Sequence, residues 1–124
     1  MSLDLFAGFP VRDLDDALVW YQRLLGSEPA FFPNDVEAVW ELAEHCYVYV
    51  EVRPEHAGHA RTTIFVEDFD ERISAAAVRG VEPVEQQAYS NGVRHATYRD
   101  PDGNELCLGG PPGDVAGPSV GQTR

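Results

Sequence analysis

The residues of this sequence with the clearest binding chemistry alternate along a predicted strand in its first half. Tyr47, Tyr49 and Glu51 occupy one set of alternating positions there, and valines occupy the other set. Neighbouring side chains of a strand point to opposite faces, so packing of the valines against a helix leaves the tyrosines on the other side. Aromatic rings stack on flat ligands and attract cations. We therefore predict a ligand-binding surface, to which the preceding strand adds further aromatic and acidic side chains: Trp40 and Glu41.

A second set of reactive side chains lies on three predicted strands of the C-terminal half. His95, beside Thr97, has the chemistry of a hydrogen-bond donor or an acid–base group, although a histidine satisfied within its strand is the simpler interpretation. Cys107 has the chemistry of a nucleophile if Arg61 lowers its pKa, but a small side chain in a cleft wall is the simpler interpretation. Thr63 shares a predicted strand face with Arg61. We expect this set to line the same cleft as the tyrosines.

An internal repeat determines where these residues are expected. The segment Val-Arg-Asp-Leu-Asp-Asp begins at residue 11, and the similar segment Val-Glu-Asp-Phe-Asp-Glu begins at residue 66. An apolar run precedes each copy, and an amphipathic helical pattern follows it. A unit of this size is too long for a solenoid repeat and too short to bury a core alone. The two halves must therefore close on each other or on a partner chain, and a ligand is expected where they meet.

Each half predicts the same order of elements: strand, helix, strand, strand, strand. Asp13 is expected to cap the first helix and Gly26 to end it. Asp68 is expected to cap the second helix in a capping-box-like pair with Glu71. The predicted strands cover residues 3–11, 30–32, 37–42, 45–52, 60–66, 81–87, 93–99 and 105–108.

This pattern predicts an α+β fold of two βαβββ modules in tandem that form a curved, cleft-lined sheet. The modules cover about residues 3–52 and 60–109 of a single domain, residues 1–109. The segment 110–124 is rich in Gly and Pro and shows no periodicity, so it is predicted to be disordered.

The composition argues against several classes of function. With 9 basic and 21 acidic residues, the chain has a formal charge of −12, which repels nucleic acid and anionic lipid and attracts cations. No apolar stretch reaches the roughly 20 residues of a membrane span, and the N-terminus lacks the basic region of a signal peptide. Cys46 and Cys107 show no spacing typical of a disulfide or a zinc site. We therefore expect a cytoplasmic protein in a reducing compartment.

Three motifs link the chain to a known superfamily. They are residues 11–26 (VRDLDDALVWYQRLLG), residues 66–70 (VEDFD) and residues 99–104 (RDPDGN). Together they resemble the strand–helix junctions and the final hairpin of the vicinal oxygen chelate superfamily, which includes glyoxalase I, extradiol dioxygenases, fosfomycin-resistance enzymes and bleomycin-resistance proteins. The resemblance covers about residues 4–109 and implies the glyoxalase-like fold.

The resemblance also indicates where a metal ion would bind. Metal-using members coordinate a divalent ion with four side chains, usually His or Glu, from the first and last strands of each half. The matching positions here are Phe6, Arg61, Cys107 and either Tyr49 or Glu51. A phenyl ring is no ligand, a guanidinium repels cations, and one thiol with one carboxylate does not make the required oxygen and nitrogen site. The resemblance therefore implies a metal-free, bleomycin-resistance-like member without a cofactor.

The function expected on these grounds is sequestration of a cationic or amphipathic small molecule in an acidic aromatic cleft, with no catalytic residue assigned. The resemblance implies a homodimer whose site lies between two chains, and no nucleic-acid or membrane partner is expected. The alternative is a superfamily lyase, isomerase or dioxygenase. It would use metal-free acid–base chemistry or a relocated metal site built from Glu51, His45 or His95. A third interpretation is a structural or regulatory dimer with a vestigial cleft.

Overall fold

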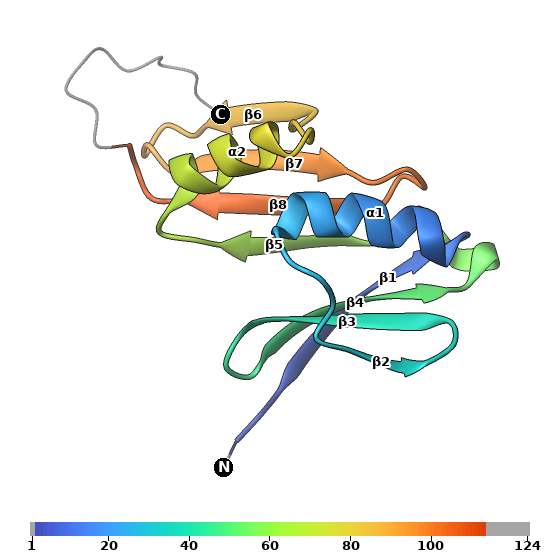
Figure 1. Ribbon diagram of the computed structural model, residues 1–124. Coiled ribbons are helices and arrows are strands. Elements are labelled where there is room, and N and C mark those ends of the chain that lie inside the picture. Colours follow the sequence, from blue (N-terminus) through green and yellow to red (C-terminus); the bar gives the residue numbers. More distant parts are fainter. Residues whose placement is uncertain (1, 114–124) are drawn as a thin grey trace.

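The computed structural model describes residues 2–113, which form two modules of one helix and four strands each (Figure 1). The first module contains β1 (Leu5–Val11), α1 (Leu14–Leu25), β2 (Phe31–Asn34), β3 (Glu37–Ala43) and β4 (Cys46–Val52). A short 3-10 helix, η1 (Pro54–His56), leads to β5 (Arg61–Phe65), α2 (Phe69–Val78), β6 (Glu85–Ala88), β7 (Arg94–Arg99) and β8 (Glu105–Gly110). The predicted α+β class and the tandem modules are confirmed. The tail predicted to be disordered lies, from residue 114 onward, outside the described residues.

Strand pairing stays inside each module. The first sheet has the order β1-β4-β3-β2 and the second the order β5-β8-β7-β6, and β1 with β4 and β5 with β8 are the parallel pairs. Within residues 2–113, no strand of one sheet pairs with a strand of the other. Figure 1 shows the sheets as separate layers, with both helices drawn beside the second sheet.

Both sheets bury one face in a single shared core. The first sheet contributes Phe9 and Trp40, and the second contributes Tyr98 and Leu106. Tyr21 of α1 lies against the first pair, with its ring centroid 5.5 Å from that of Phe9 and 5.8 Å from that of Trp40. The valines of β4 lie on this buried face, as their alternation with the tyrosines predicts. The other face of each sheet therefore lies outside the core, and we call these the first and second open faces.

The open faces follow from the strand register. The first open face comprises Phe6, Gly8 and Pro10 of β1, Glu37, Val39 and Glu41 of β3, and Tyr47, Tyr49 and Glu51 of β4. The second comprises Arg61, Thr63 and Phe65 of β5, His95, Thr97 and Arg99 of β7, and Glu105, Cys107 and Gly109 of β8.

The two helices begin differently. The Asp13 side chain accepts a hydrogen bond from the Asp16 amide at 2.9 Å, and Gly26 ends α1 with φ of 84°, so both predicted caps are confirmed. At α2, Asp68 makes no capping bond, and the predicted capping box is wrong. Its carboxylate instead accepts from Arg72 Nε at 2.7 Å, because a charged donor one turn along the helix makes a stronger bond than a neutral amide.

Asn104, at the end of the β7–β8 turn, joins the two modules. Its amide nitrogen donates to the carbonyl oxygen of Pro10 at 2.7 Å, and its amide oxygen accepts from the backbone N–H groups of Gly58 and Ala60. One buried side chain therefore ties together the first strand, the connection between the modules and the last hairpin. None of the helices within residues 2–113 is long and apolar enough to cross a membrane.

Candidate functional site

Three aromatic side chains form the centre of the first open face. Phe6 and Tyr47, paired across β1 and β4, stack with ring centroids 4.4 Å apart and an interplanar angle of 7°. Tyr49 lies across Gly8, because a Cβ atom added to Gly8 would be only 2.5 Å from Cζ of the tyrosine ring. Gly8 therefore gives the Tyr49 ring room to lie against β1. The result is an aromatic surface on two neighbouring strands, part of which is exposed to solvent.

Carboxylates border these rings. Glu41 is the β3 neighbour of Tyr47, and Glu37 is the β3 neighbour of Glu51. No strand position of this face in β1, β3 or β4 holds a basic residue. Partial desolvation and then the negative charges of Glu41, Asp4 and Glu44 raise the pKa of Tyr47. The aromatic surface therefore lies in a negative potential, which favours cations.

The second open face has a different character. Arg61, Glu105 and Arg99 are neighbours on β5, β8 and β7, and both guanidinium groups bind the one carboxylate. These hydrogen bonds, that of Arg99 first, hold the pKa of Glu105 below its ordinary value. The hydrogen bond that Arg61 donates to the Glu105 carboxylate raises the pKa of Arg61. This part of the face is thus a polar row of two cations and one anion.

The next row of the second open face consists of small side chains. Thr63, Cys107 and Thr97 are neighbours across the same three strands. Cys107 is fully buried, and its Sγ lies 3.7 Å from Oγ1 of Thr97. His95 lies one row further, with its ring centroid 6.1 Å from that of Tyr89. The thiol is therefore part of the sheet packing rather than an accessible nucleophile in this chain.

The predicted site residues thus form two groups, one on each sheet. Phe6, Glu41, Tyr47, Tyr49 and Glu51 belong to the first open face. Arg61, Thr63, His95 and Cys107 belong to the second open face. Because both sheets bury their other faces in the shared core, the two groups occupy different surfaces of the chain.

Trp40 is the exception among the predicted site residues. It pairs with Val48 on the buried side of the sheet, where its indole contacts Tyr21 and donates to the Ser27 carbonyl oxygen at 2.9 Å. Its alternation with Glu41 already places the two side chains on opposite faces. The prediction that Trp40 adds to the ligand-binding surface is therefore corrected, and Trp40 is a core residue.

A metal ion does not fit the residues present. Phe6 is stacked on Tyr47, Arg61 is bound to Glu105, and Cys107 is buried. Within residues 2–113, no group of three or more His, Cys, Asp or Glu side chains is placed to hold an ion. His45 bonds Asp4 through Nδ1 at 2.5 Å and faces Glu44 through Nε2 at 3.6 Å, so its two carboxylates lie at opposite ring nitrogens.

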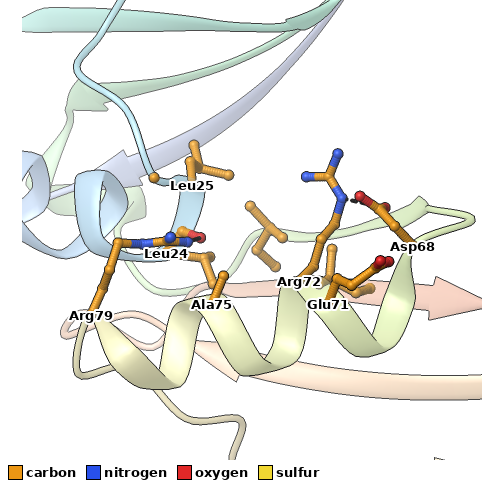
Figure 2. A pocket seen from close by; sticks show the side chains of 10 residues that line it. Leu24, Leu25, Asp68, Glu71, Arg72, Ala75 and Arg79 are labelled. Atoms are coloured by element: carbon orange, nitrogen blue, oxygen red, sulfur yellow. Dashed lines mark hydrogen bonds and ion pairs between the residues drawn. The ribbon is translucent and has the colours of Figure 1, made fainter.

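A separate hollow lies on the other side of the second sheet, between the helices. It has a volume of about 320 Å³, with walls of leucine side chains and charged residues of α2 (Figure 2). Both arginines of the lining are engaged: Arg72 binds Asp68, and Nη2 of Arg79 donates to the Leu24 carbonyl oxygen at 3.0 Å. None of the predicted ligand-binding residues lines this hollow. We therefore regard it as a feature of the helix packing.

Among the open-face residues that the sequence did not predict, four contribute to the aromatic surface and the polar row described above. Gly8 and Glu37 were not assigned to the aromatic surface, and Arg99 and Glu105 were not assigned to the polar row. A signal for the last pair existed, since a tight turn at 100–104 places residues 99 and 105 opposite each other. The role of Gly8 had no such signal, because it depends on the position of the Tyr49 ring.

Comparison with known proteins agrees with this architecture. Residues 6–109 match the family model of the glyoxalase-like domain. No curated protein matches the chain. The crystal structure of a glyoxalase / bleomycin resistance protein from Catenulispora acidiphila is 54% identical, with a TM-score of 0.87, and the match covers 90% of this chain and 100% of that one.

More distant structures share the fold. A bleomycin-binding protein complexed with bleomycin is 18% identical, with a TM-score of 0.72 over 89% of this chain and 99% of that one. Lactoylglutathione lyase from Agrobacterium tumefaciens is 16% identical, with a TM-score of 0.72 over 89% of this chain and 94% of that one. On the strength of the family match and the 54% identical structure, the chain belongs to the glyoxalase-like domain family, within the glyoxalase and bleomycin-resistance superfamily.

Proposed function

We propose that this protein binds a flat, cationic small molecule on its first open face and sequesters it without chemistry. The observation that carries the proposal is the stacked pair of Phe6 and Tyr47, with Tyr49 beside it, in a border of glutamates. A flat cation gains from stacking and from the negative potential together. A neutral ring would gain from stacking alone.

We further propose that a second copy of the chain covers this surface with its second open face. The first open face carries Glu37, Glu41 and Glu51, and the second carries Arg61 and Arg99, so their charges are complementary. Apolar side chains are exposed on both faces, which is typical of surfaces that bind a partner. In such a homodimer each cleft would contain residues of both predicted groups. A related protein of the same fold is known in complex with bleomycin.

Binding is favoured over catalysis by the chemistry of the described residues. The thiol of Cys107 is fully buried, and the superfamily metal positions hold residues that do not suit an ion. Neither cysteine forms a disulfide, which fits the reducing cytoplasm that we propose for this protein.

The test compares two probes of nearly equal shape in mildly alkaline buffer: the N-methylquinolinium cation and uncharged quinoline. We expect calorimetry to show tighter binding of the cation. Tyr47→Ala should weaken it by about tenfold, since stacking and cation–π contacts contribute about 1–2 kcal/mol. Glu41→Gln should weaken binding of the cation and leave the affinity for quinoline unchanged. Val78→Ala and Glu55→Gln, exposed changes on α2 and η1, are the matched controls.

Equal affinity for the two probes would contradict the electrostatic part of the proposal. If Tyr47→Ala binds the cation as tightly as the wild-type protein does, the ligand does not bind on the first open face. Both variants are first checked by circular dichroism, so that a change in affinity is not the result of unfolding.

A further inference from the structure

A second hollow lies between the two modules, and both of them contribute to its walls. Leu42 and Cys46, on either side of the β3–β4 turn, and Leu25, the last residue of α1, come from the first module. Ile64 of β5 and Leu108 of β8 come from the second. The hollow has a volume of about 270 Å³ and adjoins the hollow between the helices, with which it shares Leu25 and Leu108. We call it the inter-module hollow.

The inter-module hollow lies at the end of the modules that Asn104 does not tie together. Asn104 binds the carbonyl oxygen of Pro10, near the end of β1, and the amide of Ala60, just before β5. Cys46, in the wall of the hollow, pairs instead with Leu5 at the start of β1. The β5 part of the wall lies near the end of that strand. A ligand in the hollow would therefore contact both modules at the end remote from Asn104.

The walls of this hollow are mainly apolar. Apart from the Cys46 thiol, the polar side chains of its lining are the three charged ones of Glu67, Asp68 and Arg72, where α2 begins. An apolar cavity of roughly 150 Å³ holds benzene, so the inter-module hollow has room for a larger aliphatic group. Transfer of such a group from water to leucine and isoleucine side chains is favourable. The hollow can therefore take up the apolar body of a small ligand.

The charged residues of the lining leave one carboxylate unpaired. Asp68 accepts a hydrogen bond from Nε of Arg72 at 2.7 Å, so these two charges offset each other (Figure 2). Glu67 is exposed and forms no ion pair within residues 2–113. Two acidic residues and one basic residue thus leave the lining with one net negative charge. An apolar molecule with a single positive charge complements both the walls and this charge.

We propose that the inter-module hollow binds a compact aliphatic amine, with its apolar body against the leucine side chains and its ammonium group facing Glu67. A neutral aliphatic alcohol would gain from the apolar walls alone. An aliphatic carboxylate would be repelled by Glu67, and Arg72 is already bonded to Asp68. The proposal does not rest on the aromatic cation site, because neither Phe6 nor the tyrosines of the first open face line this hollow.

The experiment uses the intact protein and three probes with the same aliphatic cage: 1-adamantylamine, uncharged 1-adamantanol and anionic 1-adamantanecarboxylate. Its first readout is the melting temperature, which a ligand of the folded state raises. Its second readout is the rate at which iodoacetamide modifies Cys46, followed by mass spectrometry. Cys46 is partly exposed and borders the hollow, whereas Cys107 is fully buried and serves as the internal reference.

We expect the amine to raise the melting temperature most, the alcohol less and the carboxylate least. The amine should also slow the modification of Cys46. N-methylquinolinium should not slow it, because the surface proposed for that cation lies elsewhere. The two proposals can therefore fail independently of each other.

Variants of the lining separate the charge from the apolar walls. Glu67→Gln should weaken binding of the amine by about threefold, the value of one exposed charge contact, and leave the affinity for the alcohol unchanged. Glu55→Gln, which removes an exposed carboxylate of η1 outside the hollow, is the matched control. Ala43→Leu enlarges an exposed side chain of the lining and should weaken binding of amine and alcohol alike, by about tenfold. Tyr47→Ala should leave the affinity for the amine unchanged.

The proposal fails if the amine neither raises the melting temperature nor slows the modification of Cys46, or if Ala43→Leu binds it as tightly as the wild-type protein does. Weaker binding of the amine by Tyr47→Ala would place this ligand on the first open face instead. If the carboxylate binds more tightly than the amine, or if Glu67→Gln has no more effect than Glu55→Gln, the assignment of a cationic ligand is wrong.

Discussion

The hydroxyl group of Tyr21 donates a hydrogen bond to Oδ2 of Asp100 at 2.8 Å and so links helix α1 to the last turn of the second module. Oδ1 of the same carboxylate accepts from the backbone N–H groups of residues 102, 103 and 104, and the side chain of Asn104 donates to Oδ2. Burial and the charge of Asp100 raise the pKa of Tyr21 far above its ordinary value, so its hydroxyl stays protonated as a donor. The two modules are thus joined at a buried, fully engaged carboxylate.

Removal of this one hydroxyl should destabilise the chain, and a second buried tyrosine provides the control. Tyr21→Phe leaves the buried Asp100 carboxylate without one donor, and we expect a loss of about 1–3 kcal/mol in the free energy of unfolding, measured with urea. Tyr98 is also buried, but its hydroxyl has no partner within the described residues. Tyr98→Phe should therefore be neutral or stabilising. Equal losses in both variants would show that the Tyr21–Asp100 bond contributes nothing specific.

Gly8 should determine the position of the Tyr49 ring. In Gly8→Ala the new methyl group would lie 2.5 Å from the ring, so the ring must leave β1. We expect a loss of about 1–3 kcal/mol in stability from this overpacking, together with weaker binding of N-methylquinolinium. In the Tyr49→Ala background the same change should cost less, because the three atoms nearest to the new methyl group all belong to the Tyr49 side chain. A full loss of stability in both backgrounds would mean that the effect of alanine does not act through Tyr49.

Much of this fold is predictable from local sequence signals. The repeated segments at residues 11 and 66 give the tandem modules, and the alternation of valines and tyrosines gives the buried and open faces of β4. The β7–β8 turn was also predicted. The role of Asn104 in joining the modules was not, because its partners Pro10, Gly58 and Ala60 come together only through tertiary packing.

The candidate site was predictable in part. Alternation alone places Tyr47, Tyr49 and Glu51 on one face, and the structure shows the same arrangement. The same rule, applied to β3, separates Trp40 from Glu41 and places the indole on the buried side of the sheet, as the structure shows. The separation of the site residues into two surfaces could not be predicted, because it depends on both sheets using one core.

The polar row of Arg61, Glu105 and Arg99 should stabilise the folded protein, and this stabilisation should be lost in acid. Its hydrogen bonds to Arg99 and Arg61 lower the pKa of Glu105 in the folded state, whereas the unfolded chain has the ordinary value of about 4.3. The stabilisation is therefore complete above about pH 4.3, the pKa of the unfolded chain. It disappears as the pH falls through the lower pKa that Glu105 has in the folded state. We expect wild type to lose stability relative to Glu105→Gln over this acidic range, as measured by urea unfolding at each pH.

Carboxyl NMR titrations test the same row directly. The Glu105 pKa should lie below its ordinary value in the wild-type protein and rise in both arginine variants. The rise should be larger in Arg99→Gln than in Arg61→Gln, because Arg99 donates two of the hydrogen bonds. An ordinary Glu105 pKa in the wild-type protein would contradict the shared ion pair.

The proposed homodimer should depend on the second open face. Phe65 is 60% exposed there, and a glutamate in its place would oppose the acidic first open face of the partner. Phe65→Glu should therefore shift the protein from dimer to monomer in sedimentation equilibrium. Val78, which is 88% exposed on α2, provides a matched control, and Val78→Glu should leave the dimer intact.

Because the faces carry opposite charges, the dimer should also weaken as salt is added. If the wild-type protein is a monomer at all concentrations, no second chain contributes to the site. If the dimer forms equally well in Phe65→Glu, the interface lies elsewhere on the chain.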